Sequence, residues 1–410
     1  MSPSSLLSFP RRCGRRLWDQ YSWLIESGYP IPLTVLSLYR IALAAYMLAL
    51  NAIPDLRWIA SYPELFYDPP SGMPAIWGGF LPYWALVALE LGLILAICGL
   101  LVGWRTPFMS VAVTVVGYAA NSAYFSFGKI DHTFMLWIVP GLLAFSGWGR
   151  FYSVDASWIP GRSTRRRSFA TAPSAEPWER QTDDVQGSDG PRSGGRQAEI
   201  REMAPAWPVA AIGVLLAMSF LTAAVPKILK GWLSFDTSAV KRHVDRSFQL
   251  DGDQLLAEAL LDFDFQPFWE ALDWGAVGLE VALSVGFLWP LAQRWLIFAV
   301  WIFHLANLVL LNIGFYGPLA VYPLFFLPLV SPEAGARVGE ALMRRWRLAA
   351  AAVPVLALVA FFGQGLWWTV TREVMGLSPL WSDLTFFAFG FVVLIAVAVL
   401  TKGYRKVIMT

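Results

Sequence analysis

The sequence predicts an all-α membrane protein, a polytopic bundle of about ten transmembrane helices. Of the 410 residues, 57% are hydrophobic and only 15% are charged, which is far more apolar than a soluble chain normally is. The chain also contains ten apolar runs of the length, about 20 residues, that a helix needs to cross the hydrocarbon layer. A third observation, the uneven distribution of Lys and Arg between these runs, orients the bundle.

The ten apolar runs are the predicted membrane spans. They cover residues 32–53, 82–102, 107–127, 132–147, 207–227, 271–289, 294–313, 315–330, 348–369 and 384–400. The fourth and eighth are short and are interrupted by proline, at Pro140 and at Pro318, Pro323 and Pro328. Because proline lacks a backbone donor, we expect these two spans to be tilted or partly unwound.

The basic residues predict which side of the membrane each connection faces. Short cytoplasmic loops hold an excess of Lys and Arg. With a cytoplasmic N-terminus and ten crossings, 22 of the 31 Lys and Arg residues lie inside, 8 lie outside, and Arg40 lies within the first span. The sequence therefore predicts a multi-pass protein of the cell membrane with both termini in the cytoplasm.

Composition along the chain divides it into five parts. They are a basic cytoplasmic tail (1–31), a first four-helix half (32–160), a flexible cytoplasmic linker rich in Arg, Ser, Gly, Pro and Gln (161–206), a second half that includes an outer segment at 228–270 (207–330), and a cytoplasmic loop with two C-terminal helices (331–410). The two halves share a weak repeat, because Glu90 precedes Arg105 much as Glu280 precedes Arg294. Parallel halves of this kind often hold a site between them.

Charge and cysteine content narrow the range of partners. The net charge of +2 gives no indication of a nucleic-acid partner, so none is predicted. Cys13 and Cys98 are the only cysteines, which leaves no basis for a disulfide framework or a Cys-rich metal site. No metal is predicted, and the lipid bilayer is the first expected partner.

A few ionisable residues lie within or at the edge of the predicted spans. They are Arg40, Glu90, Glu280 and His304 within spans, and Lys227 and His132 at the outer boundary. Charges are costly at this depth, and they usually pair with one another or line a polar cavity.

Each of these residues has a structural interpretation. Lys227 extends to the outer headgroups, and His304 forms interhelical hydrogen bonds together with Asn307. Arg40 forms a buried pair with Glu90 or Glu280. His132 belongs to a polar helix start that follows Asp131.

The functional interpretation takes them together, because the predicted topology directs Lys227, His132, Glu90 and Glu280 toward the outer leaflet, with His304 just below. A lysine at the edge of an apolar cavity loses part of its preference for the charged form, and the neutral amine can then act as a base. The hydroxyl of a quinol is a suitable proton donor for such a base. Apolar, aromatic walls suit a lipid-soluble substrate.

Several strings resemble one family, the vitamin K-dependent gamma-carboxylase-like membrane domain, also called the horizontally transferred transmembrane (HTTM) domain. In chain order they are Leu38-Tyr39-Arg40, Phe66-Tyr67-Asp68, Asp131-His132, Phe151-Tyr152-Ser153-Val154-Asp155, Ala224-Val225-Pro226-Lys227 with Gly231-Trp232, Gly278-Leu279-Glu280, and Phe303-His304. The resemblance extends over about residues 32–330.

This resemblance implies a quinol-dependent lyase or oxygenase. The eukaryotic enzyme of the family uses oxygen to convert reduced vitamin K to its epoxide, and the base so formed removes a proton from a glutamate that then takes up carbon dioxide. By resemblance, Lys227 corresponds to the lysine that deprotonates the hydroquinone and His132 to a histidine associated with carboxylation. The expected cofactor is reduced vitamin K or another quinol, and the expected acceptor is a secreted peptide or protein. The predicted substrate-binding residues are His304, Glu280, Trp232 and Arg40.

The sequence also departs from the family. Pro226 stands where the enzyme has the first of two adjacent lysines, and two predicted helices after residue 347 replace the large lumenal domain that recognises substrate proteins. A second interpretation therefore stands beside the enzymatic one: a non-catalytic membrane factor that assists the maturation or export of a peptide, or that binds lipid.

Overall fold

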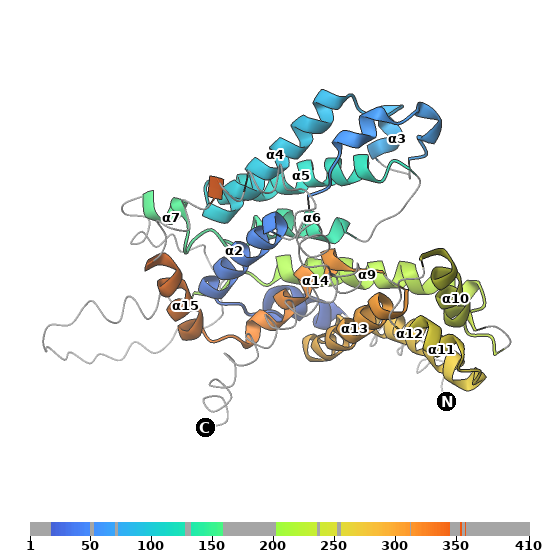
Figure 1. Cartoon of the computed structure of the whole chain (residues 1–410). Coiled ribbons are helices and arrows are strands. Elements are labelled where there is room, and N and C mark those ends of the chain that lie inside the picture. Colours follow the sequence, from blue (N-terminus) through green and yellow to red (C-terminus); the bar gives the residue numbers. More distant parts are fainter. Residues whose placement is uncertain are drawn as a thin grey trace, which may run out of the picture.

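The structure, a computed structural model, is built of helices (Figure 1). It describes residues 18–49, 53–69, 73–127, 133–158, 202–235, 238–251, 256–311 and 313–344, together with positions 353, 354 and 357. Within those residues every regular element is a helix, and only two isolated β-bridges are present, Pro32 with Met203 and Asp68 with Phe127. The predicted all-α class is confirmed for this part of the chain.

The helices of the first half begin after a short helix at residues 18–27. They are α2 (Leu33–Ala49), η1 (Arg57–Ser61), η2 (Glu64–Phe66), α3 (Met73–Trp77), α4 (Tyr83–Val102), α5 (Thr106–Tyr124), α6 (Phe134–Leu143) and α7 (Val154–Trp158). Those of the second half and beyond are α9 (Trp207–Leu229), α10 (Ala239–Asp251), α11 (Ala257–Leu261), α12 (Gln266–Gly286), α13 (Pro290–Leu311), α14 (Tyr316–Val321), η3 (Tyr322–Leu329) and α15 (Pro332–Arg344).

Each of the first eight predicted spans coincides with helix. Three helices are long and apolar enough to cross a membrane, Tyr83–Val102, Trp207–Leu229 and Pro290–Leu311. Shorter apolar helices cover Leu33–Leu48, Phe134–Leu143 and Gly317–Leu329. The ninth predicted span is described at only three positions and the tenth lies outside the described residues, so the total of about ten crossings stays a prediction.

Proline shapes these helices as the sequence indicated. Pro107, Pro208 and Pro267 stand in the first turns of α5, α9 and α12, where a missing N–H costs nothing. Pro140 lies inside α6, which is only 10 residues long. The eighth predicted span divides into the short helix α14 and the 3-10 helix η3, which confirms its expected irregularity.

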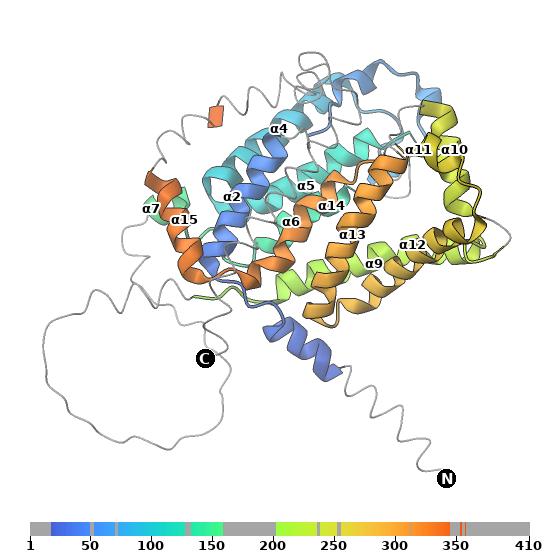
Figure 2. The same ribbon diagram turned by 60° about the horizontal axis from the view of Figure 1, so that its bottom comes forward.

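The two halves repeat one packing arrangement. In the first half, α4 packs against α2 and α5, and in the second, α12 packs against α9 and α13. The halves meet where α6 contacts α9 and α14. Figure 2 shows α6 and α14 in the middle of the bundle. The predicted correspondence between helices one to four and five to eight stays a prediction, with which this packing order is compatible.

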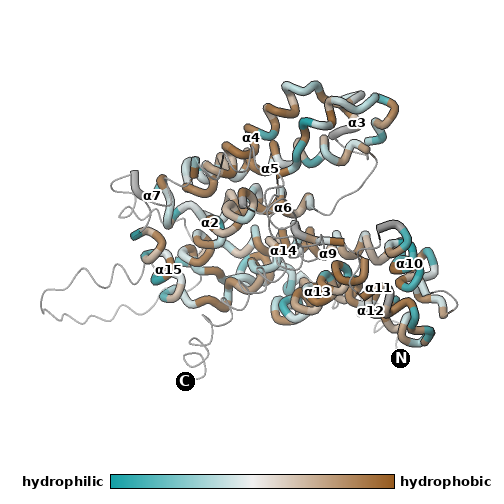
Figure 3. The backbone as a smooth tube through the Cα atoms, in the orientation of Figure 1, coloured by the Kyte–Doolittle hydropathy of each residue, from teal (hydrophilic) through white to brown (hydrophobic). Residues whose placement is uncertain are grey.

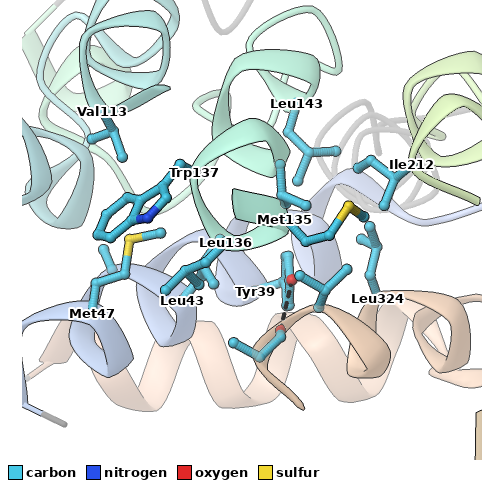
Figure 4. Close-up of a cluster of buried hydrophobic side chains, with 14 of the residues drawn as sticks. Tyr39, Leu43, Met47, Val113, Met135, Leu136, Trp137, Leu143, Ile212 and Leu324 are labelled. Atoms are coloured by element: carbon cyan, nitrogen blue, oxygen red, sulfur yellow. Dashed lines mark hydrogen bonds between the residues drawn. The ribbon is translucent and has the colours of Figure 1, made fainter. Parts of the chain in front are cut away.

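The main hydrophobic core runs through this junction. Figure 4 shows side chains of α2, α5, α6, α9 and η3 meeting there, including Met47, Val113, Trp137, Ile212 and Leu324. The hydroxyl of Tyr39, also in this core, donates a hydrogen bond of 2.9 Å to the Ala320 carbonyl. The bond fixes α2 against α14.

Two polar elements lie at the edges of the apolar bundle (Figure 3). The outer segment forms α10 and α11, which share a small core with α12 around Val244, Ala257 and Trp269. The segment predicted as a loop after residue 330 contains α15, which packs against α2. Figure 3 shows both α10 and α15 as more hydrophilic than the central helices.

Candidate functional site

The side chain of Lys227 forms an ion pair with Glu280. Lys227 lies in the last turn of α9, directly after Pro226, and Glu280 lies on the face of α12 that is buried in the bundle. The Lys227 ammonium donates to Glu280 Oε1. The Lys227 side chain is 23% exposed and that of Glu280 only 4%, so the pair stands at the boundary between the bundle and its surroundings.

The second carboxylate oxygen of Glu280, Oε2, takes no part in the hydrogen bond with Lys227. Oε2 is buried and has no hydrogen-bond partner among the described residues. An unsatisfied buried carboxylate oxygen is uncommon in folded proteins and calls for an explanation. It supplies a lone pair that can accept a hydrogen bond or a proton.

One aromatic side chain, that of Trp232, lies against the Lys227 ammonium. Its Nζ lies 5.0 Å from the centroid of the Trp232 ring, within the range of cation–π attraction. The His243 ring of α10 lies against the same tryptophan, with ring centroids 5.4 Å apart. Trp232, which the sequence predicted as a site residue, thus contacts both Lys227 and His243. His243 was not predicted.

His243 was missed because it lies in a polar helix rather than in an apolar span. One sequence signal was available, since the chain has only three histidines. Burial lowers the pKa of His243 below its ordinary value, and the nearby charges of Lys227, Arg242 and Arg246 lower it further. Asp273 alone among the named neighbours acts in the opposite direction.

His304 lies deeper, in an aromatic environment. It is 3% exposed, and its Nε2 is 2.8 Å from the hydroxyl of Tyr322 in η3. The ring stacks on Phe315 at 4.3 Å and faces Phe220 of α9 at 6.4 Å. The predicted interhelical hydrogen bond of His304 is present, with Tyr322 as its partner.

Lys227 belongs to α9, and His304 of α13 packs against the same helix. Phe220 of α9, which His304 contacts, precedes Lys227 by two turns, or about 10 Å along the helix axis. His304 therefore contacts α9 about two turns from Lys227, and α12 and α13, which carry Glu280 and His304, pack against each other.

The predicted pairing of Arg40 is wrong. Arg40 is fully buried, and its guanidinium donates to the carbonyls of Leu100 at 3.0 Å and Tyr152 at 2.5 Å. Leu100 is in the last turn of α4, and its carbonyl also accepts a hydrogen bond of 3.2 Å from the Gly103 backbone N–H. Since Glu90 is ten residues earlier, about 15 Å along α4, Arg40 does not reach it.

Glu90 and Glu280 instead have equivalent partners in the two halves. Glu90 accepts from the Leu56 backbone N–H at 2.5 Å and forms an ion pair with Arg57, whose Nε is 3.4 Å from Oε2. Glu280 pairs with Lys227. Arg40 was predicted to bind substrate, but its guanidinium binds backbone carbonyls of the first half. Glu280, also predicted to bind substrate, forms an ion pair with Lys227.

Other predicted features have different outcomes. His132 and the neighbouring Asp131 lie outside the described residues. Within the part of the chain that the structure describes, no three His, Cys, Asp or Glu side chains gather in a way that could hold a metal ion.

An open apolar groove of about 360 Å³ lies between α3, α4 and α5, lined by Trp77, Trp84 and Leu89 among others. It contains none of the residues around Lys227.

No family model, characterised protein or solved structure matches this chain. The resemblance to the carboxylase-like family therefore rests on the sequence strings alone.

Proposed function

We propose that this chain is a multi-pass membrane protein of the vitamin K-dependent gamma-carboxylase-like (HTTM) type, with about ten spans and both termini in the cytoplasm. In this proposal a quinol or similar lipid binds at the outer leaflet beside Lys227 and Glu280. The protein then removes a proton from the quinol hydroxyl, and the resulting anion reacts with oxygen.

The Lys227–Glu280 pair is the observation that carries this proposal. A charged amine that donates to a carboxylate holds its proton and is not itself a base. Glu280 Oε2, which is buried and has no hydrogen-bond partner in the described part of the chain, is the atom with a lone pair available. We therefore assign proton removal to Glu280.

Lys227 has a different role in this mechanism. Its ammonium stands beside the carboxylate that accepts the proton, where it stabilises negative charge as it develops on the quinol oxygen. In a site with little water such a charge interaction is stronger than in solution. Trp232 provides an apolar surface next to the ammonium, and the aromatic side chains around His304 are the proposed contacts of the substrate ring.

The test is an activity measurement on the purified protein in lipid nanodiscs. Vitamin K hydroquinone, oxygen and labelled bicarbonate are supplied with a glutamyl peptide, and epoxide and fixed label are measured. We expect Glu280→Gln and Lys227→Met each to lower epoxide formation about 100-fold or more, the usual contribution of a positioned acid or base. Lys241→Met, which removes a cation paired with exposed Asp264, is the matched control and should retain activity.

The opposite result is equally informative. If the wild type and the variants all give background epoxide, the enzymatic proposal is excluded for these substrates. That outcome favours the alternative of a non-catalytic factor that binds lipid or assists the maturation or export of a peptide.

A further inference from the structure

The outer segment concentrates positive charge on the side of the membrane where it is least expected. Of the 8 Lys and Arg residues placed outside by the proposed topology, five lie between Lys227 and Arg246. Membrane proteins normally keep such residues in the cytoplasm. A cluster that is retained outside indicates a role for the charge itself.

Two of these five cations are already paired with carboxylates, and Arg242 and Arg246 are two of the other three. Lys227 pairs with Glu280, and Lys241 pairs with Asp264 at 3.0 Å. Arg242 and Arg246 are exposed, and neither forms an ion pair within the described residues. They are four residues apart in α10, so they project from the same side of the helix.

The electrostatic environment of His243 places these arginines near Lys227. Both arginines and Lys227 act on His243 as neighbouring positive charges. Asp273 acts on His243 in the opposite sense, but its two oxygens accept hydrogen bonds of 2.7 Å from the Ala239 and Val240 backbone N–H groups. Asp273 also interacts electrostatically with Arg242. Within the described residues, however, neither Arg242 nor Arg246 forms an ion pair, and both remain exposed on α10.

An exposed apolar stripe runs along α9 toward the end of the helix that carries Lys227. Met218, Leu221, Val225 and Leu229 are between 38% and 80% exposed. Their spacing of three and four residues aligns them on one helix face. The stripe ends at Lys230, which is exposed and follows α9 directly. An acyl chain can lie along such a stripe while a charged headgroup reaches its end.

We propose that the outer face of α10 binds the phosphate of an anionic phospholipid through Arg242 and Arg246, with an acyl chain of that lipid along the exposed stripe of α9. Guanidinium groups suit phosphate because they donate in pairs at fixed geometry. The lipid stands next to Trp232 and Lys227 and forms one wall of the approach to that pair. This inference rests on the membrane placement in the proposed function and not on its quinol chemistry.

Lipid binding can be measured directly by native mass spectrometry. The full-length protein, delipidated in a neutral detergent, is titrated with phosphatidylglycerol or with phosphatidylcholine. We expect a preference for phosphatidylglycerol that weakens as salt is added. Arg242→Gln/Arg246→Gln should reduce phosphatidylglycerol affinity about thirtyfold, the effect of two cations near a membrane surface, and should leave phosphatidylcholine binding unchanged.

Three controls make the result decisive. Lys241→Gln removes one charge from the same helix and should preserve the preference, because Asp264 already neutralises Lys241. Arg242→Lys/Arg246→Lys keeps the charge and should lose only part of the affinity. The comparison of the two lipids on the wild type needs no variant, so it holds even if a substitution prevents folding.

Two outcomes overturn the proposal. One is equal affinity of the wild type for the two lipids. The other is displacement of phosphatidylglycerol by an equal concentration of glycerol 3-phosphate, which would identify a site for a soluble anion. Because no quinol is present, failure of the proposed chemistry leaves this measurement unaffected.

Discussion

Lys227 and Glu280 are neighbours in an ion pair, but their surroundings differ. Glu280 is enclosed by the bundle, whereas Lys227 retains contact with the exterior at 23% side-chain exposure. The flexible lysine can extend outward if its partner is removed, as long basic side chains do at membrane edges. The glutamate cannot, so the two single substitutions should differ in cost.

Substitutions of Lys227 and Glu280 should lower the free energy of unfolding by unequal amounts. Lys227→Met leaves a buried carboxylate without its counter-charge and should lower the free energy of unfolding by about 3 kcal/mol. Glu280→Gln should cost less, because Lys227 reaches solvent. The double variant Lys227→Met/Glu280→Leu should regain most of the loss. Thermal unfolding in detergent, followed by tryptophan fluorescence, measures all three. Equal losses in Lys227→Met and in the double variant would contradict a coupled pair.

At the scale of elements, the turn from α4 to α5 shows how one corner is fixed. Gly103 ends α4 with a φ of +71°, and a Cβ there would overlap the guanidinium of Arg40. The carboxylate of Asp155 then accepts the first backbone donors of α5, from Arg105 and Thr106, each at 2.8 Å. Asp155 belongs to a string that carried the family resemblance, and its position here gives it a capping role.

A comparison of Gly103 with Gly231, which lies just after α9, separates the effect of backbone conformation from the effect of packing. Gly231 has nearly the same φ, +77°, but no atom lies within 4 Å of a Cβ built on it. Both Gly103→Ala and Gly231→Ala should lose about 1 kcal/mol from the left-handed backbone. Gly103→Ala should lose a further 1–3 kcal/mol, roughly, from overlap with Arg40 and Ser153. Unfolding curves of the two variants, recorded in one detergent, should show this difference. If the two lose the same stability, Arg40 and Ser153 have both moved aside and their contacts with the turn are weak.

Hydropathy located the helices well but not all of their ends. The apolar run predicted at 271–289 overlaps α12, which begins earlier, at Gln266, and ends at Gly286. The first turns of α12 carry polar groups such as Gln266 and Glu270, which hydrogen-bond to each other at 2.6 Å. A scan for apolar residues stops at such groups, although the helix continues through them.

Contacts between helices were less predictable than the helices. The sequence indicated that Arg40, Glu90 and Glu280 would need partners, because isolated charges are costly within an apolar bundle. Which partner each residue finds depends on how far along its helix it lies. Arg40 reaches helix-end carbonyls, and Glu90 reaches Arg57 in a 3-10 turn that hydropathy does not reveal. His243 escaped notice for the same reason, since it approaches Lys227 only through tertiary structure.

At the scale of the whole molecule, the two halves share a charge arrangement as well as a packing order. In each half the second long helix carries a buried glutamate that pairs with a cation. That cation is Arg57 of η1 in the first half and Lys227 of α9 in the second. The pairs differ in surroundings, because Arg57 also contacts Asp55 while Lys227 faces Trp232. The repeated scaffold thus holds one pair among polar groups and the other beside an aromatic ring.

The number of crossings depends most on the eighth predicted span. The 14 residues of α14 and η3, which lie within this span, would cover only about 21 Å as a regular α-helix. Because η3 is a 3-10 helix of 8 residues, with a rise of about 2.0 Å per residue, the 6-residue α14 and η3 together reach about 25 Å. That length approaches the roughly 30 Å of the hydrocarbon layer, so we expect this segment to cross.

Cysteine labelling tests the crossing. The background is Cys13→Ser/Cys98→Ser, in which Asp262→Cys and Arg337→Cys each place a thiol at an exposed position. Along the chain, Asp262 precedes three segments and Arg337 follows them. These segments are α12, α13, and α14 together with η3. We expect a membrane-impermeant maleimide to label Asp262→Cys in intact cells and Arg337→Cys only after lysis. If α14 and η3 enter the membrane and return on the same side, two crossings remain and both positions label alike. Labelling of Arg337→Cys alone in intact cells would invert the whole orientation and place the Lys227–Glu280 pair at the cytoplasmic leaflet.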